Sequence, residues 1–282
     1  MYADAVQYIA ILPTGETMSE SHDSYDERYF EPLAAVEAKH FWFRSRNQLI
    51  AGLIRKYCHA NPAAPLYGME IGCGTGNVLT FLTKQFPQQR LIGVDLFMEG
   101  LAVARRRGAE LLVQADINHA PLAGKFSWIG LFDIIEHLDD DVQVLRETSS
   151  LLDENGLLFI SVPAFPVLWS YFDVAGRHKR RYVAQTLQQS VEAAGLELVY
   201  AGYTYALLFP PMWVQRRLFQ GNKAPETLSD EEVEQKTNDE LRIIPVANAI
   251  VRLLLGLENR LIMAGGHLPF GTSMIAVAKR KR

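Results

Sequence analysis

The run Glu-Ile-Gly-Cys-Gly-Thr-Gly-Asn at residues 70–77 has residue types and spacing suited to binding a ligand. A short apolar segment precedes the run and an amphipathic segment follows it, which predicts a strand, a glycine-rich loop and a helix. Gly72, Gly74 and Gly76 permit a tight turn and a close approach of the backbone to a ligand, because no Cβ atom stands in the way. We therefore expect a ligand to lie over this loop.

The acidic residue at the start of the loop indicates the kind of ligand. A dinucleotide places its pyrophosphate over such a loop and the following helix N-terminus, where the carboxylate of Glu70 would repel it. The glycines also follow the spacing G-x-G-x-G, whereas the third glycine of the nucleotide fingerprint G-x-G-x-x-G would fall on Asn77. Both features favour a cationic ligand without phosphate.

Further acidic residues stand where the next three strands are expected to end. In open α/β sheets the ligand lies beyond the carboxyl ends of the strands. There Asp95 could accept both hydroxyls of a ribose, Asp116 could accept an adenine amino group, and Asp133 would follow the fourth strand. Each residue alone could simply cap a helix or turn a loop. Four acidic residues at four consecutive strand ends favour one shared ligand site.

These motifs resemble the S-adenosylmethionine (SAM) methyltransferases of class I. From about residue 37 to 200 the chain is similar to the ubiquinone/menaquinone-methyltransferase-like (type 11/12) group. The resemblance implies SAM as cofactor and a set of cofactor-binding positions. These positions are Glu70, Gly72, Gly74, Gly76, Asp95, Leu96, Asp116, Ile117, Phe132 and Asp133. Arg44, in the segment His-Phe-Trp-Phe-Arg, could meet the SAM carboxylate or equally pair with an acidic surface residue.

Two histidines are candidates for catalysis. Methyl transfer gains most of its acceleration from in-line positioning, but an oxygen acceptor benefits from a general base, and histidine is well tuned for this near neutral pH. His137 follows the fourth expected strand, and His178 lies in a basic run, residues 177–181, that could bind an anionic acceptor. A helix-start residue and a surface-loop residue are the respective structural alternatives. No His/Asp/Glu cluster has the sequence spacing of a metal site, so none is predicted.

The most concrete functional hypothesis is O-methylation of a small-molecule, glycan or lipid-linked acceptor. An NAD(P)-dependent Rossmann oxidoreductase is one alternative, although Glu70 argues against it. A non-catalytic SAM-binding protein is another, because no base is securely assigned. The sequence indicates neither the acceptor nor the oligomeric state.

The composition restricts the class of protein. An apolar fraction of 49% with 21% charged residues over 282 residues is typical of a globular protein. A net charge of −4 gives no basic excess for a nucleic-acid partner. The two cysteines cannot form a disulfide framework, which favours a reducing, cytoplasmic location.

Apolar segments alternate with amphipathic ones from residue 65 to about 200, which predicts an α/β fold. We expect a doubly wound, mostly parallel, seven-stranded Rossmann-like sheet whose last strand is antiparallel. The expected strands span 66–71, 90–95, 110–114, 127–132 and 156–162, with a final pair at 196–208 and 272–279. The expected helices span 75–86, 99–107, 139–152 and 184–194.

The remaining segments are assigned around that sheet. Residues 1–20 are expected to be a non-native or disordered extension, 21–60 an N-terminal helical lid, and 61–282 the SAM-binding domain. Its helical insertion, at about 207–271, precedes the last strand. Apolar stretches with nearby arginines in this insertion could contact the inner face of a membrane peripherally. They could instead line an acceptor cavity, or pack in the core or against a second subunit.

Overall fold

The computed structural model describes residues 30–58, 66–117, 122–218, 229, 232, 235, 236, 239 and 241–281. The expected extension at residues 1–20 lies outside this part of the chain. The strands are β1 (Tyr67–Ile71), β2 (Arg90–Asp95), β3 (Leu111–Gln114), β4 (Phe126–Phe132), β5 (Leu152–Pro163), β6 (Leu196–Thr204) and β7 (Ser273–Arg280).

The α-helices are α1 (Phe30–Glu37), α2 (Phe41–Tyr57), α3 (Asn77–Gln85), α4 (Met98–Arg106), α5 (Asp141–Ser150), α6 (Tyr171–Ala175), α7 (Ala184–Ala193), α8 (Phe209–Leu218) and α10 (Pro245–Met263). Short 3₁₀ turns are η2 (Ile135–His137), η3 (Pro166–Leu168) and η4 (Ala206–Leu208).

The strands form one sheet in the order β3-β2-β1-β4-β5-β7-β6. The first five strands in this order run parallel to one another, and β7 lies between β5 and β6 and runs antiparallel to both. The order reverses between β1 and β4, the point at which open α/β sheets bind ligands. The predicted Rossmann-like sheet with an antiparallel last strand is therefore confirmed.

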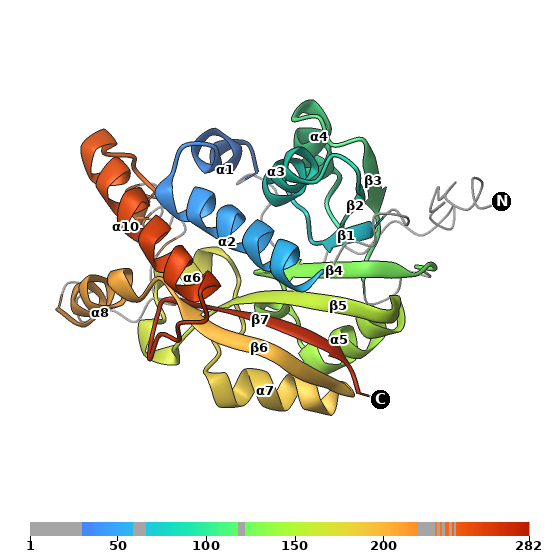
Figure 1. Ribbon diagram of the computed structural model, residues 1–282. Coiled ribbons are helices and arrows are strands. Elements are labelled where there is room, and N and C mark those ends of the chain that lie inside the picture. Colours follow the sequence, from blue (N-terminus) through green and yellow to red (C-terminus); the bar gives the residue numbers. More distant parts are fainter. Residues whose placement is uncertain are drawn as a thin grey trace.

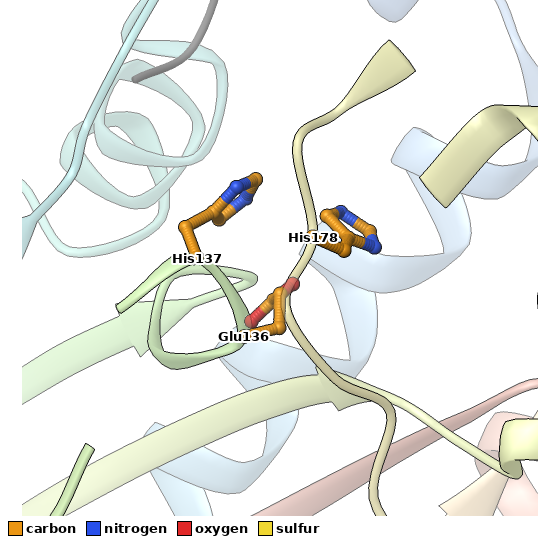
Figure 2. A group of neighbouring side chains, drawn as sticks. All are labelled: Glu136, His137 and His178. Atoms are coloured by element: carbon orange, nitrogen blue, oxygen red, sulfur yellow. The ribbon is translucent and has the colours of Figure 1, made fainter. Parts of the chain in front are cut away.

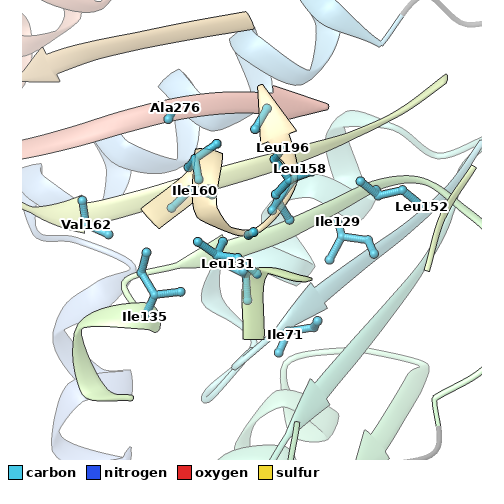
Figure 3. Close-up of a cluster of buried hydrophobic side chains, with 14 of the residues drawn as sticks. Ile71, Ile129, Leu131, Ile135, Leu152, Leu158, Ile160, Val162, Leu196 and Ala276 are labelled. Atoms are coloured by element: carbon cyan, nitrogen blue, oxygen red, sulfur yellow. The ribbon is translucent and has the colours of Figure 1, made fainter. Parts of the chain in front are cut away.

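Helices cover both faces of the sheet, with α2, α3 and α10 on one side and α5 and α7 on the other (Figure 1). Strand residues alternate between the two faces. Ile129, Leu131 and Ile160 pack in the cluster with α5 and α7 (Figure 3). Trp128 and Phe159 pack in the opposite cluster with α2 and α3. Burial of both faces explains the nearly continuous apolar strands.

Most elements agree closely with the sequence-based boundaries, but two strands differ by four residues at one end. β6 ends at Thr204 rather than at residue 208. β5 begins at Leu152 rather than near residue 156. Leu152 pairs with Phe126 of β4, and a register shift separates this pair from the pair Trp128–Leu157. Residues assigned to the end of the preceding helix thus continue the strand across a bulge.

The helical insertion lies between β6 and β7 and contributes α8 and α10. α10 packs across α2 (Figure 1). Two asparagines of α10 fasten this contact: Asn248 Oδ1 accepts the Phe41 N–H at 2.8 Å, and Asn259 Nδ2 donates to the Ser45 carbonyl at 2.9 Å. Within the described residues, every helix is too short or too polar to span a bilayer.

Candidate active site

A cavity of about 1010 Å³ lies at the carboxyl ends of the parallel strands, beneath α1 and α2. This volume is at the upper end of the roughly 300–1,000 Å³ usual for small-ligand sites, so it has room for a cofactor and an acceptor together. Most of the predicted site residues line it: Glu70, Gly72, Gly74, Asp95, Leu96, Asp116, Ile117, Phe132, Asp133, His137 and His178. Gly76 and Arg44 are not among its lining residues.

The glycine loop is held close to β2. The Gly72 and Cys73 N–H groups both donate to the Val94 carbonyl, at 2.7 and 3.0 Å. Gly72 has φ +72°, and a Cβ atom there would lie 2.0 Å from a side-chain carbon of Ile134. Gly76, at φ +69°, begins α3 and packs against α4, so its role in the structure is the turn itself.

Glu70 is buried on the α2 side of β1. Its Oε2 atom has no hydrogen-bond partner among the described residues. Burial raises the pKa of this carboxyl well above its ordinary value; the guanidinium of Arg46 offsets part of the effect, and Asp95 and Glu37 add to it. A positively charged ligand would relieve this desolvation, whereas a phosphate would worsen it. The unpartnered oxygen thus fits the cationic groups of SAM.

Asp95 holds the glycine loop in place through hydrogen bonds, and both are predicted to bind the cofactor. Its Oδ2 accepts the Gly74 N–H at 2.6 Å, and its Oδ1 accepts the Phe97 N–H at 2.9 Å. A carboxylate has about four lone-pair sites, so roughly two remain for further donors. That remainder matches the two hydroxyls of a ribose.

Arg46, and not Arg44, reaches the cavity. Arg44 is exposed and absent from the lining, which does not support its predicted contact with the SAM carboxylate. Arg46 donates to Asp133 Oδ2 at 2.5 Å and lies over the Trp42 ring at 4.7 Å. Burial alone would lower the pKa of Arg46, but Asp133 raises it. Residues two positions apart on a helix point about 200° apart around its axis. Which of Arg44 and Arg46 points inward therefore depends on how α2 is rotated against the sheet.

The helix α1 covers the glycine loop through a shared carboxylate. Glu37 Oε2 accepts from the Thr75 hydroxyl at 2.7 Å and from Arg107 Nη1 at 2.6 Å. Arg107 also donates to the Ala34 carbonyl at 2.6 Å. The C-terminal half of α1 is thereby fixed to the glycine loop and to Arg107 at the end of α4, in a position to restrict the access of water.

The two candidate histidines meet in the lining of the cavity. The rings of His137 and His178 lie edge to face, with centroids 4.7 Å apart. Burial, with a smaller effect of His178, lowers the pKa of His137 to about 3, so this imidazole is neutral near pH 7. His178 Nδ1 lies 2.9 Å from Asp173 Oδ1. Burial opposes ionisation of Asp173, but His178 and Arg181 together lower its pKa to about 2.

The basic run at residues 177–181 is largely compensated by acidic partners. Its pairs are Lys179 with Asp139, Arg180 with Asp141 at 3.2 Å, and Arg181 with Asp173 at 2.6 Å. Cations already paired in this way offer little unpaired charge to an anion. The structure therefore gives no support to the predicted use of this run for an anionic acceptor.

Two functional positions escaped the sequence-based interpretation. Asp173, which orients His178, belongs to a capping box with Ser170. The S-x-x-D pattern could have located the helix start, but not the contact with His178. Arg46 lies four residues after Trp42 and therefore on the same helical face.

No metal site was predicted, because the spacing along the chain gave none. The fold nevertheless brings Glu136, His137 and His178 together, with one ligand atom from each within 4.8 Å of the others (Figure 2).

Comparisons with known proteins agree with this geometry. Residues 27–201, more than half of the chain, match a family model described as a methyltransferase domain. A probable SAM-dependent methyltransferase of Mycobacterium tuberculosis is 28% identical over 133 residues, covering 45% of this chain and 44% of the relative. Trans-aconitate 2-methyltransferase of Yersinia pseudotuberculosis is 27% identical over 158 residues, covering 54% and 59%. The chain thus spans about half the length of the curated relatives it matches.

Solved structures share the fold at low sequence identity. A plantazolicin methyltransferase, BpumL, in complex with a substrate analogue and SAH, has a TM-score of 0.56 at 14% identity, with 90% of each chain covered. A SAM-dependent methyltransferase from Thermotoga maritima has a TM-score of 0.52 at 18% identity, covering 90% of this chain and 97% of the other. The predicted enzyme class and SAM as cofactor are confirmed at the level of the domain, while the ubiquinone/menaquinone-like subgroup is not distinguished. The chain belongs to the methyltransferase domain family.

Proposed function

We propose that this protein transfers the methyl group of SAM to an oxygen atom of a small-molecule, glycan or lipid-linked acceptor. The observation that carries the proposal is the Asp173–His178 pair, whose histidine lines the cavity. A carboxylate that holds one imidazole nitrogen leaves the other to accept a proton. Such a pair is useful to a hydroxyl acceptor, which must lose its proton as it is methylated.

The residues of the chain divide into two groups. Glu70, Asp95 and the glycine loop hold the cofactor, which when bound supplies an electrophilic methyl group on its sulfonium. His178 takes up the acceptor proton, and Asp173 with Arg181 keeps its ring in place. The helix α1 limits access of water to the reacting groups.

The nature of the acceptor distinguishes this chain from one kind of relative. Trans-aconitate 2-methyltransferase is named for a polycarboxylate, and an ionised carboxylate needs no base to be methylated. Here the cations near the histidines are paired with Asp139, Asp141 and Asp173. We therefore favour a hydroxyl acceptor over a multiply charged one.

A methyl-transfer screen with isotope-labelled SAM tests the proposal. The acceptor panel contains hydroxylated glycans, quinols, lipid-linked sugars and, for comparison, polycarboxylates. We expect O-methyl products, and we expect His178→Ala to slow their formation by about 10²–10⁴-fold, the usual contribution of acid–base catalysis. His267→Ala is the control, since this exposed ring stacks on Tyr200, outside the cavity lining.

Three outcomes would overturn the proposal. Methylation confined to nitrogen or carboxylate acceptors would assign a different acceptor. An unchanged O-methylation rate in His178→Ala would show that His178 is not the general base. Tight SAM binding without turnover on any acceptor would favour the non-catalytic alternative. The oxidoreductase alternative is not favoured, because a pyrophosphate over the glycine loop would bring negative charge to the buried Glu70, whose Oε2 has no hydrogen-bond partner among the described residues.

We further propose that α10 provides peripheral contact with a membrane, which suits a lipid-linked acceptor. Its inward face carries Leu255, Asn259 and Ile262. A second stripe at helical spacing is apolar and more than half exposed at every position: Val246, Ile250, Leu253, Leu257 and Leu261. Arg252 and Arg260 are exposed on the same helix, where they can reach anionic headgroups.

Flotation with vesicles of phosphatidylglycerol and phosphatidylcholine tests this contact. We expect the protein to float with the vesicles, and Leu253→Glu to abolish flotation. Met98→Glu, at a 52% exposed apolar residue on α4, is the matched control. Flotation that is absent, or equal in both variants, would contradict the proposal; a dimer abolished by Leu253→Glu would assign the stripe to subunit contact.

A further inference from the structure

The buried carboxylate of Glu136 stands next to the two histidines without a hydrogen-bond partner. Glu136 has 0% exposure, and both of its carboxylate oxygens lack a hydrogen bond to any described residue. Figure 2 shows this carboxylate beside the rings of His137 and His178, below both in the view. An unpartnered buried carboxylate costs several kcal/mol unless a cation or a proton compensates it. The fold must therefore supply a compensating group here.

The cationic side chains nearby are committed elsewhere. Arg181 donates to both oxygens of Asp173, and Arg46 donates to Asp133. Neither hydrogen-bonds to Glu136. What remains to compensate the carboxylate is a proton or a cationic ligand, and the groups beside Glu136 bear on which of the two it is.

The chemistry of the surrounding donors suits a metal ion. One ligand atom of Glu136, one of His137 and one of His178 all lie within 4.8 Å of each other. Asp173 accepts from the Nδ1 of His178, so that Nε2 carries the lone pair. A carboxylate behind a histidine is the usual support of a metal-binding imidazole, because it fixes the tautomer and the ring orientation.

We propose that Glu136, His137 and His178 bind a divalent transition-metal cation. Two imidazoles and one carboxylate favour Zn²⁺, Mn²⁺ or Fe²⁺ over Mg²⁺ and Ca²⁺, which prefer oxygen ligands. Two ligands about 2.1 Å from an ion span at most roughly 4.2 Å, so binding draws the three side chains slightly closer together. All three residues line the cavity, so the remaining coordination positions face it.

The cation also has a role in methyl transfer, and this part of the inference rests on the proposed function. An acceptor hydroxyl that occupies an open coordination position is acidified by the metal. A cation held by Glu136, His137 and His178 would thus supply the acidity that lets the hydroxyl give up its proton to solvent or buffer as the oxygen is methylated. His178 then acts as a ligand in place of the base.

Cation binding can be measured without any acceptor. Protein without a histidine tag is stripped with chelator and titrated calorimetrically with MnCl₂ and ZnCl₂, and Mn²⁺ binding is repeated by electron paramagnetic resonance. We expect one saturable site. Glu136→Gln and His178→Ala should each weaken binding by at least about tenfold, because even residues behind a ligand cost 10–100-fold. The affinity for SAH, measured on the same samples, reports whether each variant is folded.

The matched controls are Glu197→Gln and His267→Ala. Glu197 pairs with Lys279 on β7, and His267 stacks on Tyr200; neither lines the cavity. Both should leave the metal affinity unchanged. Absence of saturable binding, or binding that Glu136→Gln and His178→Ala leave unchanged, would overturn the metal site.

Methyl transfer separates this inference from the proposed function. O-methylation that chelator abolishes and Mn²⁺ or Zn²⁺ restores supports the metal site and the proposed O-methylation, and it replaces the role of His178 as base by that of a ligand. O-methylation that is equally fast in chelated protein overturns the metal site and leaves the proposed function standing. A saturable metal site in a protein that methylates no oxygen acceptor supports the metal site and overturns the proposed function.

Discussion

Asp95→Asn separates the charge of this side chain from its shape. The amide keeps the size of the carboxylate, and one oxygen can still accept a hydrogen bond from the Gly74 or Phe97 N–H. Burial raises the pKa of Asp95, which means that its negative charge costs free energy on folding. We therefore expect a small effect on folding and a larger one on cofactor binding.

The size of the effect follows from the hydrogen bonds available to Asp95. Two lone-pair sites remain for the ribose hydroxyls after the two backbone bonds. A hydrogen bond to a charged group contributes about 1.5–3 kcal/mol, against about 0.5–1.5 for a neutral pair. Losing the charge at two bonds costs about 2–3 kcal/mol, which weakens SAM binding about 30- to 150-fold.

Calorimetric titration with SAM and with SAH measures this change, and urea unfolding of the free protein measures the effect on folding. Asp153→Asn is the control, because the Asp153 carboxylate accepts a hydrogen bond from the Ser127 hydroxyl and neither residue lines the cavity. An affinity loss below about threefold, with unchanged folding, would refute the assignment of Asp95 to the ribose. A large loss confined to folding would show that Asp95 serves only the loop.

Three further substitutions test other parts of the site. Because Arg46 and not Arg44 lines the cavity, we expect Arg46 to make the contact with the SAM carboxylate that the sequence predicted for Arg44. Arg46→Gln should then weaken SAM binding at least about tenfold by removing a charge-assisted contact, whereas Arg44→Gln should leave the calorimetric affinity unchanged. Equal effects of the two substitutions would contradict this role of Arg46. Because the pKa of Glu70 is raised, the native state retains its proton above the unfolded value of 4.5 and loses stability as pH rises. Glu70→Gln removes this penalty, so its free energy of unfolding in urea should exceed that of the wild type at pH 8. This difference should shrink by about 1 kcal/mol or more towards pH 5, and SAM binding should weaken; a difference that does not depend on pH would contradict the reasoning. Gly76→Ala, at φ +69° with its new Cβ 2.6 Å from that of Ala104, should cost about 2–4 kcal/mol of unfolding free energy, and a loss below about 0.5 kcal/mol would show that the loop adapts.

The strand ends could be predicted because their position depends on local pattern. Alternating apolar segments locate the strands, and parallel strands bring their carboxyl ends to one edge. Glu70, Asp95 and Asp133 therefore reached the same cavity as expected. The contacts that each residue makes there could not be predicted from the sequence. Asp133, for example, is paired with Arg46, which lies on a helix outside the sheet.

What the sequence could not indicate at this site depends on the relative placement of elements. Arg44 and Arg46 have the same charge and nearly the same sequence context, and only the packing of α2 decides which one is inside. The cluster of Glu136, His137 and His178 depends on the path of the chain from β5 through α6, which brings His178 back to η2. Spacing along the sequence carries no information on such a return.

The charges that line the cavity explain why both proposed ligands are cations. Glu70 and Glu136 each have a buried carboxylate oxygen without a hydrogen bond to any described residue. Asp95 is bonded only through neutral backbone N–H groups in its described contacts. Arg46 is a buried cation near them, and Asp133 holds it. SAM would compensate the charge of Glu70, and a divalent metal ion would compensate that of Glu136. A pyrophosphate would instead add negative charge beside carboxylates that no cation neutralises.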